Sequence, residues 1–394
     1  MVTKNTRLRI ATRRRSTSLH RSLGFTGVGT VIAFACCSAA NEGVETLTGA
    51  GGKEPVSTSG PAVGAGGGPA CVPIVDGVPL SQGDGLVPHL TRHGAGFAAA
   101  WLEGKKVLVA LVSATGDVHR RVVVGNAGGA AGMPSVHVTN DGLVALWSDG
   151  ADVMARRLAT DGTPVGAPFV VATTTSLEPR PAAASLDDKL AVAWMSNPET
   201  VAVTVAQTSV APASSATGWF PAVTSGAGGA SIAWSYGGRT GPVRVAALDG
   251  MGSSDFVQLP NSQALVKSLL YAGGAHYVSW EDVATSTEQV HLARVDLTNG
   301  LVSARVTVAP TDASANWPSI AVAGGRVAVA YYQFRSNAPE VLLAVFDSSL
   351  GQQEFEHTLA TNARFPSAVG FEDRFAVAYN RNGGRIELSV VDCP

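Results

Sequence analysis

The chain has 394 residues, of which 45% are hydrophobic and 15% are charged, and it contains 45 glycines. Helix-forming residues are too sparse and too irregularly spaced for a helical protein, whereas short runs of Ala and Val suit many small buried strands. The formal net charge is −2, and without seven cations near the N-terminus 21 basic residues remain against 30 acidic ones, so nucleic acid is not an expected partner.

The first 37 residues have the layout of an export signal. Seven basic residues precede a mostly apolar run from Leu23 to Ala35, which is too short to span a bilayer comfortably. The segment Ala33-Phe34-Ala35-Cys36 resembles the lipobox of bacterial lipoproteins, in which the cysteine carries the lipid. We therefore predict a lipid on Cys36 as the only membrane anchor, with simple signal cleavage and secretion as the alternative.

Residues 38–70 differ in composition from everything that follows. They are rich in Gly, Ala, Ser, Thr and Pro and contain runs such as Gly64-Ala65-Gly66-Gly67-Gly68. Such a segment cannot bury a core and is typical of a flexible tether. We expect the folded domain to span residues 71–394.

Within that domain one spacing recurs seven times. A strand start, usually Pro, is followed thirteen residues later by a Trp or Tyr that closes an apolar run. The windows are residues 88–101, 134–147, 181–194, 221–234, 267–280, 318–331 and 366–379, and their starts lie 40 to 51 residues apart. This period is typical of the blades of a β-propeller.

Each repeat predicts four strands. The first strand follows the Pro, which tolerates a strand start because its missing N–H costs little there. The second strand ends in the aromatic residue, which we expect to pack between blades rather than bind a ligand. The third and fourth follow after polar and Gly-bearing turns. The sequence therefore predicts an all-β fold, a seven-bladed β-propeller of four-stranded blades.

The C-terminus predicts how the ring closes. The last repeat stops at Cys393-Pro394, where the other repeats turn into a fourth strand. The segment from Cys71 to about Val78 precedes the first repeat and can supply the missing strand. Cys71 and Cys393 are the only cysteines of the folded part, and export places them in an oxidising compartment. We predict a disulfide between them.

Over residues 71–394 the rhythm of Pro and Trp or Tyr resembles the broad class of exported repeat β-propeller lipoproteins of bacteria. The chain does not match the signatures of WD40, kelch or sialidase propellers, because it has neither a Gly-His and Trp-Asp pair nor a Ser-x-Asp-x-Gly-x-x-Trp box at equivalent places. The resemblance therefore assigns no residue a specific function.

Candidate ligand-binding residues lie in the loops at one end of the predicted blades, where propellers usually bind ligands around a central channel. Aromatic and Arg side chains there could stack on a sugar or anchor a protein partner. The alternative is that these are ordinary solvated loops. The candidates at the entrances to the first strands and in the loops after the second strands are Arg180, Trp219, Trp317, Phe365, Tyr236, Arg335 and Arg381.

No catalytic motif, cofactor site or metal site is expected. The histidines are scattered, and His89 and His93 are close in sequence but have no third ligand nearby. The carboxylates Glu281 and Asp282 are expected to be solvated in a loop. We predict a monomeric, non-catalytic binding module of the cell envelope, as an outer-membrane or cell-surface lipoprotein or a periplasmic or secreted protein, with an unknown glycan or envelope protein as partner. The alternatives are a glycan-active hydrolase or lyase and a structural scaffold.

Overall fold

The computed structural model describes residues 71–394 apart from short stretches within them. Those stretches are residues 129–132, 177, 187–188, 198–199, 207–213, 227–228, 238–239, 249–255, 260–262, 284–286, 310–312, 336–337 and 382–383. The predicted signal, Cys36 and the predicted tether lie outside the described residues. No helix in the described part is long and apolar enough to cross a membrane.

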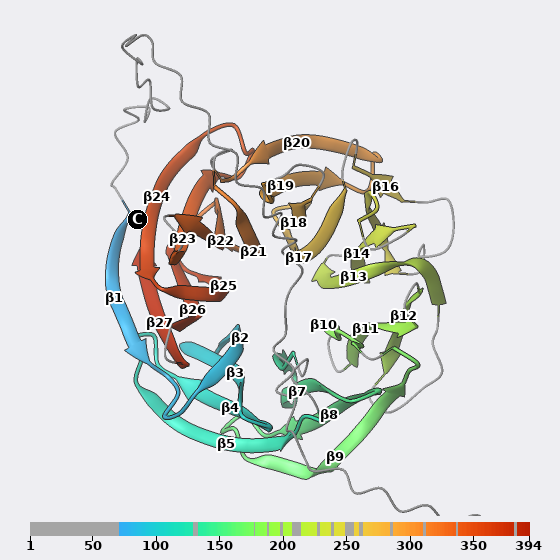
Figure 1. Ribbon diagram of the computed structural model, residues 1–394, viewed down its shortest axis with the longest axis vertical. Helices are drawn as coiled ribbons and strands as arrows, with labels where there is room; N and C mark the ends of the chain where they lie inside the picture. Colours follow the sequence, from blue (N-terminus) through green and yellow to red (C-terminus); the bar gives the residue numbers. More distant parts are fainter. Residues whose placement is uncertain are drawn as a thin grey trace, which may run out of the picture. The chain divides into compact units, whose positions relative to one another are not determined.

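The described strands form five four-stranded sheets and one seven-stranded sheet, all antiparallel between neighbours. The sheets are arranged around a common centre (Figure 1). Each four-stranded sheet has one strand facing the centre, and the seven-stranded sheet has two, β10 and β13. An all-β propeller of four-stranded blades is therefore confirmed.

The strands of the four-stranded sheets follow in chain order. They are β2 (Gly85–His93), β3 (Gly96–Glu103), β4 (Lys106–Val112) and β5 (Val118–Asn126); β6 (Ser135–Thr139), β7 (Gly142–Asp149), β8 (Asp152–Leu158) and β9 (Pro164–Thr173); β17 (Ala264–Ala272), β18 (Ala275–Asp282), β19 (Gln289–Asp296) and β20 (Leu301–Thr307); β21 (Ala315–Ala323), β22 (Arg326–Arg335), β23 (Ala338–Asp347) and β24 (Gln353–Thr361); and β25 (Ala363–Phe371), β26 (Arg374–Arg381) and β27 (Arg385–Asp392) with β1 (Val72–Pro79).

The seven-stranded sheet is continuous through one long strand. Its strands are β10 (Ala182–Leu186), β11 (Lys189–Asn197), β12 (Thr200–Ala206), β13 (Ser214–Gly226), β14 (Gly229–Tyr236), β15 (Val243–Ala247) and β16 (Val257–Gln258). The first residues of β13, Ser214 to Thr217, pair with β12, whereas Gly218 to Gly226 pair with β14. One strand thus serves as the last member of one hairpin series and the first member of the next.

The seven aromatic residues that close the sequence repeats are buried, as predicted. Each is at most 1% exposed, and each lies in a hydrophobic cluster that joins its own repeat to the preceding one or, for the first repeat, to the last. We call them the interface aromatics: Trp101, Trp147, Trp194, Trp234, Trp280, Tyr331 and Tyr379. Because each such side chain can bury 150–250 Å², these residues hold neighbouring sheets together.

Space for two of the indole rings comes from glycines, one in the preceding sheet and one on the neighbouring strand of the same sheet. Gly125 in β5 lies against Trp147, and a Cβ atom added there would come within 2.3 Å of the indole ring. Gly218 lies against Trp234 in the same way, at 2.3 Å. The glycines therefore allow the close approach of the rings at these two interfaces.

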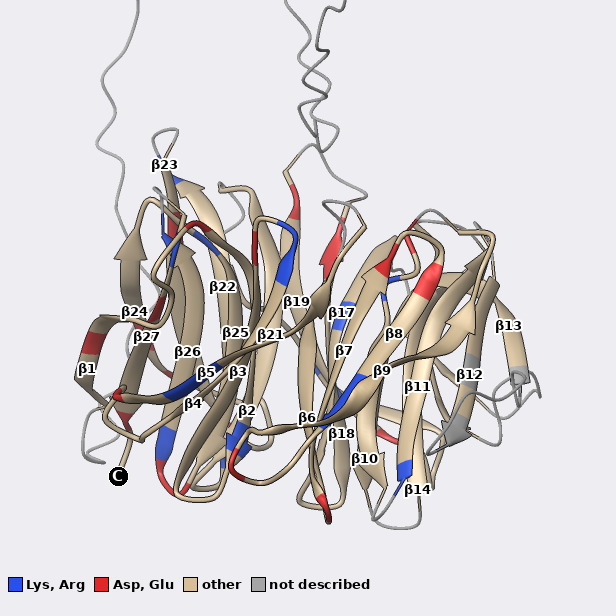
Figure 2. Cartoon of the chain, turned by 90° about the horizontal axis from the view of Figure 1, so that it is seen from below, with Lys and Arg blue, Asp and Glu red and all other residues tan. Residues whose placement is uncertain are grey.

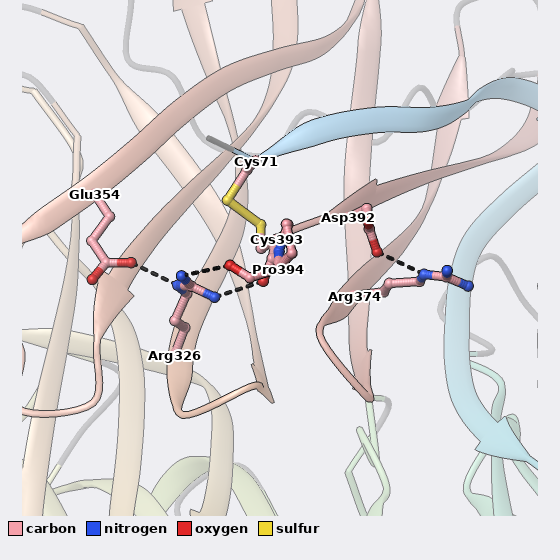
Figure 3. The surroundings of a disulfide bond; sticks show 7 residues. All are labelled: Cys71, Arg326, Glu354, Arg374, Asp392, Cys393 and Pro394. Carbon is pink, nitrogen blue, oxygen red and sulfur yellow. Dashed lines mark hydrogen bonds and ion pairs between the residues drawn. A yellow bond between two sulfur atoms is a disulfide. The ribbon is translucent and has the colours of Figure 1, made fainter. Parts of the chain in front are cut away.

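The last sheet is completed by the N-terminal strand, as the sequence predicted. β1 pairs with β27, with Val72 opposite Asp392, and Cys71 is disulfide-bonded to Cys393 across 322 residues of chain. Figure 3 shows the guanidinium of Arg326 donating hydrogen bonds to the carbonyl oxygens of Cys393 and Pro394, while it is paired with Glu354. Hydrogen bonds, an ion pair and a covalent bond therefore converge on the closure.

Charged side chains avoid the middle of most strands. In Figure 2 the Lys, Arg, Asp and Glu residues lie mainly near the strand ends and on the outer strands, while the strand centres are largely uncharged. This follows from the burial of strands such as β3 and β7 on both faces. Charged groups are therefore found mainly near the strand ends and on the outer strands.

Candidate functional site: the central channel

A cavity of about 300 Å³ lies at the centre, where the strand entrances of all seven sequence repeats meet. A second cavity, of about 440 Å³, shares lining residues such as His89 and His137 with the first. Both are lined by the innermost strands β2, β6, β10, β13, β17, β21 and β25 or the residues just before them. We call these two cavities together the channel. We call the end of the channel at which the innermost strands begin the channel mouth.

The backbone at the channel mouth has the same unusual conformation six times. The residue directly before the Pro has a positive φ, between 32° and 55°, at Val87, Met133, Arg180, Phe220, Trp317 and Phe365. In β2, β13, β21 and β25 the pairing with the next strand skips two residues at this point. Bulky residues rarely adopt this conformation, which costs about 1–3 kcal/mol. The fold therefore imposes a bulge at the entrances of β2, β13, β21 and β25.

The bulges determine which side chains line the mouth. The residue before the Pro lines the cavity in five of the six cases, and Phe365 instead contacts Trp317, with ring centroids 5.1 Å apart. The fifth repeat has Lys267 in place of Pro, and its strand skips only that residue. Hence the one repeat without Pro places a cationic side chain in the cavity lining.

Cations and aromatic rings alternate along this part of the mouth. The guanidinium of Arg180 lies 4.5 Å from the ring centroid of Phe220, and the ammonium of Lys267 lies 5.4 Å from the same ring. Lys267 is also 4.2 Å from the Trp317 ring, which in turn contacts Phe365 edge-on. We call these five residues the cation–aromatic arc. Such contacts contribute about 0.5–2 kcal/mol each and fix the cations in place.

A buried carboxylate anchors the arc. Glu281 is 3% exposed, its Oε2 lies 3.3 Å from Lys267 Nζ, and its other oxygen accepts a hydrogen bond from the backbone N–H of Trp317. The expectation that Glu281 and Asp282 are solvated in a loop is therefore wrong. Both belong to β18 and are buried, because the strand extends two residues beyond Trp280 and Glu281 finds its cation on the neighbouring strand.

The candidate residues separate into two groups. Arg180 and Trp317 line the channel mouth and Phe365 adjoins it, while Trp219 is half-buried with its ring 6.1 Å from Phe220. The other three lie at the same ends of their sheets but outside the lining residues of both cavities. Tyr236 is covered by the guanidinium of Arg244, Arg335 is exposed at the end of β22, and Arg381 is paired with Glu387 at 3.0 Å.

Sequence reasoning missed the closest pair of histidines. His89 and His137 face each other across neighbouring strands with ring centroids 5.1 Å apart, whereas His93 lies apart from them and is hydrogen-bonded to the carbonyl of Thr160. Burial lowers the pKa of His89 to about 4 and that of His137 well below its usual value. The signal available in sequence was the distance from the Pro, which is one residue for His89 after Pro88 and three residues for His137 after Pro134. Both distances are odd, so both side chains lie on the same face of their strands.

A metal ion is not favoured by this pair. Nδ1 of His89 accepts a hydrogen bond from the backbone N–H of Val136, so its Nε2 carries the proton of the neutral ring. A metal ligand must instead present an unprotonated nitrogen. Within the described residues no group of three or more His, Cys, Asp or Glu side chains is arranged to hold a metal ion.

Comparison with known proteins gives the fold and little else. No protein-family model matches the chain, and no curated protein matches it. Among solved structures it is similar to a prolyl endopeptidase, at 16% identity and a TM-score of 0.50, covering 77% of this chain but only 46% of the endopeptidase. It is also similar to the β-propeller domain of Cps50 (Swd1) from Myceliophteria thermophila, at 13% identity and a TM-score of 0.50, covering 79% of this chain and 97% of that domain. At such identities the similarity shows a propeller fold alone.

Proposed function

We propose that this protein is an exported, lipid-anchored, seven-bladed propeller that binds a ligand of the cell envelope at its channel mouth without catalysing a reaction. The ligand we propose is a glycan, and a protein partner is the other outcome of the test below. The observation that carries the proposal is the cation–aromatic arc, because it gathers side chains from five successive repeats, four of which line one cavity.

The interfaces between repeats support the proposed number of blades. The hydrophobic clusters that contain the interface aromatics are seven in the described residues, and each joins two successive repeats. A seven-stranded sheet counts as two blades when β13 is divided at Gly218, where its pairing changes from β12 to β14. The sequence repeats, the clusters and this division support seven blades.

Export and anchoring rest on the N-terminal sequence and on the closure. The basic and apolar segments before Cys36 are typical of a lipoprotein signal, and residues 38–70 have a tether-like composition. The disulfide between Cys71 and Cys393 is compatible with an oxidising compartment. Labelling with a radioactive fatty acid in a bacterial host tests the anchor, since Cys36→Ser should lose the label and Cys37→Ser should keep it.

The two alternative functions lack a specific observation. A glycan hydrolase of the usual kind needs two carboxylates at its site, whereas the described residues that line the channel include none. A structural scaffold would be expected to expose a contiguous apolar patch for its partners. The large exposed hydrophobic residues, such as Val72, Val165 and Leu301, lie instead on the outer strands of separate sheets.

A glycan array probed with the purified full-length protein tests the proposal. We expect reproducible binding that is lost in Trp317→Ala and retained in Leu301→Ala, which changes an exposed side chain on the outer strand β20. Binding that survives Trp317→Ala would move the site away from the channel mouth. No binding across a broad array would contradict the glycan, and crosslinking in intact cells would then test a protein partner at the same surface.

A further inference from the structure

The innermost strands are joined to one another by side chains. The residue after the Pro, or after Lys267, accepts a hydrogen bond from a backbone N–H of the next innermost strand. Ser268 accepts from Ile320, Ser319 from Ala368, and Ser367 from Leu90, at 3.3, 2.9 and 2.9 Å. His89 continues the series, since its Nδ1 accepts from Val136 at 3.3 Å. Four successive repeats, from the fifth through the seventh to the first, therefore share one device.

This device leaves a proton on each acceptor group. A serine hydroxyl that accepts an N–H still has its own O–H to donate, and a neutral histidine that accepts at Nδ1 donates at Nε2. Among the described residues, no acceptor is found for the hydroxyl protons of Ser268, Ser319 and Ser367 or for Nε2 of His89. All four side chains line the cavity at the channel mouth.

The remaining repeats differ at the same position. Ser135 is hydrogen-bonded to His137, and the third and fourth repeats have Ala182 and Ala222 there. One side of the channel wall thus carries hydrogen-bond donors, and the other side carries small apolar groups. A ligand that fits this wall places acceptor oxygens toward the first, fifth, sixth and seventh repeats, and Arg180, just before the third repeat, adds a cation on the other side.

Charge at the cavity has a single sign. The lining residues include the cations Arg180 and Lys267, and their carboxylate partners Glu178 and Glu281 are not among them. Arg180 is 20% exposed in its side chain, and its partner Glu178 is 46% exposed, so solvent weakens that pair. A carboxylate or sulfate entering the cavity would meet donors and cations and no like charge.

We propose that the channel mouth binds the acid group of an anionic saccharide, held by the hydroxyls of Ser268, Ser319 and Ser367, Nε2 of His89 and the guanidinium of Arg180. This inference rests on the proposed glycan-binding function and adds that the bound glycan is negatively charged. The half-buried ring of Trp317, directly beside these donors in the lining, offers an apolar surface for the sugar ring.

Titration calorimetry on the full-length protein with three probes tests the inference. The probes are a galacturonic acid trimer, a sulfated galactose trimer and a neutral galactose trimer. We expect at least one acidic trimer to bind about tenfold more tightly than the neutral one, and the stronger of the two identifies the acid group. Arg180→Gln should weaken acidic binding about fivefold to tenfold and reduce its dependence on salt.

Serine variants separate recognition from folding. The double variant Ser319→Ala, Ser367→Ala should weaken acidic binding about tenfold, while Ser319→Thr, which keeps the hydroxyl, should retain it. Ser303→Ala, on the exposed outer strand β20, is the matched control. Thermal melts show which variants are folded. If the double variant does not fold, Arg180→Gln still tests the inference.

Three results would overturn the inference and can be told apart. Equal binding of neutral and acidic trimers, lost in Trp317→Ala, would leave the glycan-binding function standing and remove its charge preference. Acidic binding that is unchanged in Arg180→Gln and in the folded serine variants would place the anion elsewhere. Binding of no trimer, together with an empty glycan array, would contradict the function itself.

Discussion

The interfaces between sheets and the wall of the channel are built from the same repeat but differ in how much they vary. Thirteen residues after each strand start, every repeat has Trp or Tyr, buried to within 1% exposure. Just before the strand start the repeats have instead Val87, Met133, Arg180, Phe220, Val266, Trp317 and Phe365. The uniform position fills similar spaces between sheets, whereas the variable position lines a common cavity in all repeats but the last. Uniformity therefore accompanies the packing of the sheets, and variation accompanies the proposed binding site.

The largest test of this difference removes one aromatic ring from each region. Trp280→Ala should lower the free energy of unfolding by about 3–5 kcal/mol, because it empties a fully buried site between β13–β16 and β17–β20. Trp317→Ala removes a half-buried ring and should cost about 1–2 kcal/mol. Denaturant unfolding followed by fluorescence measures both. Equal costs would mean that the channel mouth is as structural as the interfaces.

The second test concerns the ring closure and measures whether one interface depends on a covalent bond. Cys71→Ser, Cys393→Ser should destabilise the oxidised protein by about 2–4 kcal/mol, since the disulfide restricts the unfolded chain over a separation of 322 residues. Unfolding midpoints in oxidising and reducing buffer measure the effect. The wild type in reducing buffer is the control and should match the double variant. No shift in either would mean that the pairing of β1 with β27 suffices alone.

A third test uses pH to examine the channel wall. Burial lowers the pKa of His89 to about 4 and also that of His137, so both are neutral in the folded state. Because the unfolded chain binds these protons near pH 6.5, the contribution of the pair to stability should be constant above that pH and should fall between pH 6.5 and 4, by about 2–3 kcal/mol for His89 and by a further amount for His137.

The variant His89→Gln, His137→Gln isolates that contribution. Its melting temperature should fall less steeply over the same pH range, although burial also lowers the pKa of His276 and His291, which therefore contribute to the slope in both proteins. His119→Gln, at an exposed position, is the control. An unchanged slope in the double variant would mean that water reaches the pair in the folded state.

The smallest expected effect concerns the space that glycine leaves for an interface aromatic. Gly125→Ala should destabilise the protein by about 1–3 kcal/mol, because the new Cβ would lie 2.3 Å from the indole of Trp147. Gly83→Ala is the control, since its Cβ would meet only ordinary contacts at 3.7 Å and beyond. A comparison of unfolding midpoints checks this. A neutral Gly125→Ala would show that the sheets can separate slightly without loss.

Sequence was sufficient for whatever recurs along the chain. The spacing from Pro to Trp or Tyr predicted the strands and the interface aromatics, and the missing final strand predicted the pairing of β1 with β27 and the disulfide. Repetition is visible in one sequence because each repeat meets the same physical environment. The prediction of ligand-binding residues had no such support, and it drew candidates from both the cavity lining and its surroundings.

What sequence did not predict depends on contacts between strands. The proximity of His89 to His137 arises from the alignment of two neighbouring innermost strands, and the burial of Glu281 beside Lys267 arises from the pairing of β18 with β17 within one repeat. No local pattern encodes either contact. The positive φ before each Pro is likewise unexpected from sequence, because residues other than glycine rarely adopt a positive φ. The contacts of the folded state compensate for the backbone strain. Lys267 in place of Pro was the single local sign that one entrance differs from the others.

The disulfide also determines how the domain responds to mechanical load. A force applied through the residues before Cys71 meets a covalent bond to Cys393 before it reaches any hydrogen bond between β1 and β27. We expect the oxidised domain to resist pulling from its N-terminus as a closed ring, and the reduced domain to lose β1 one residue pair at a time. Single-molecule extension in oxidising and reducing buffer would compare the two. Under the proposed anchoring through the N-terminus, any load on the domain would enter at Cys71, beside the covalent bond that closes the ring.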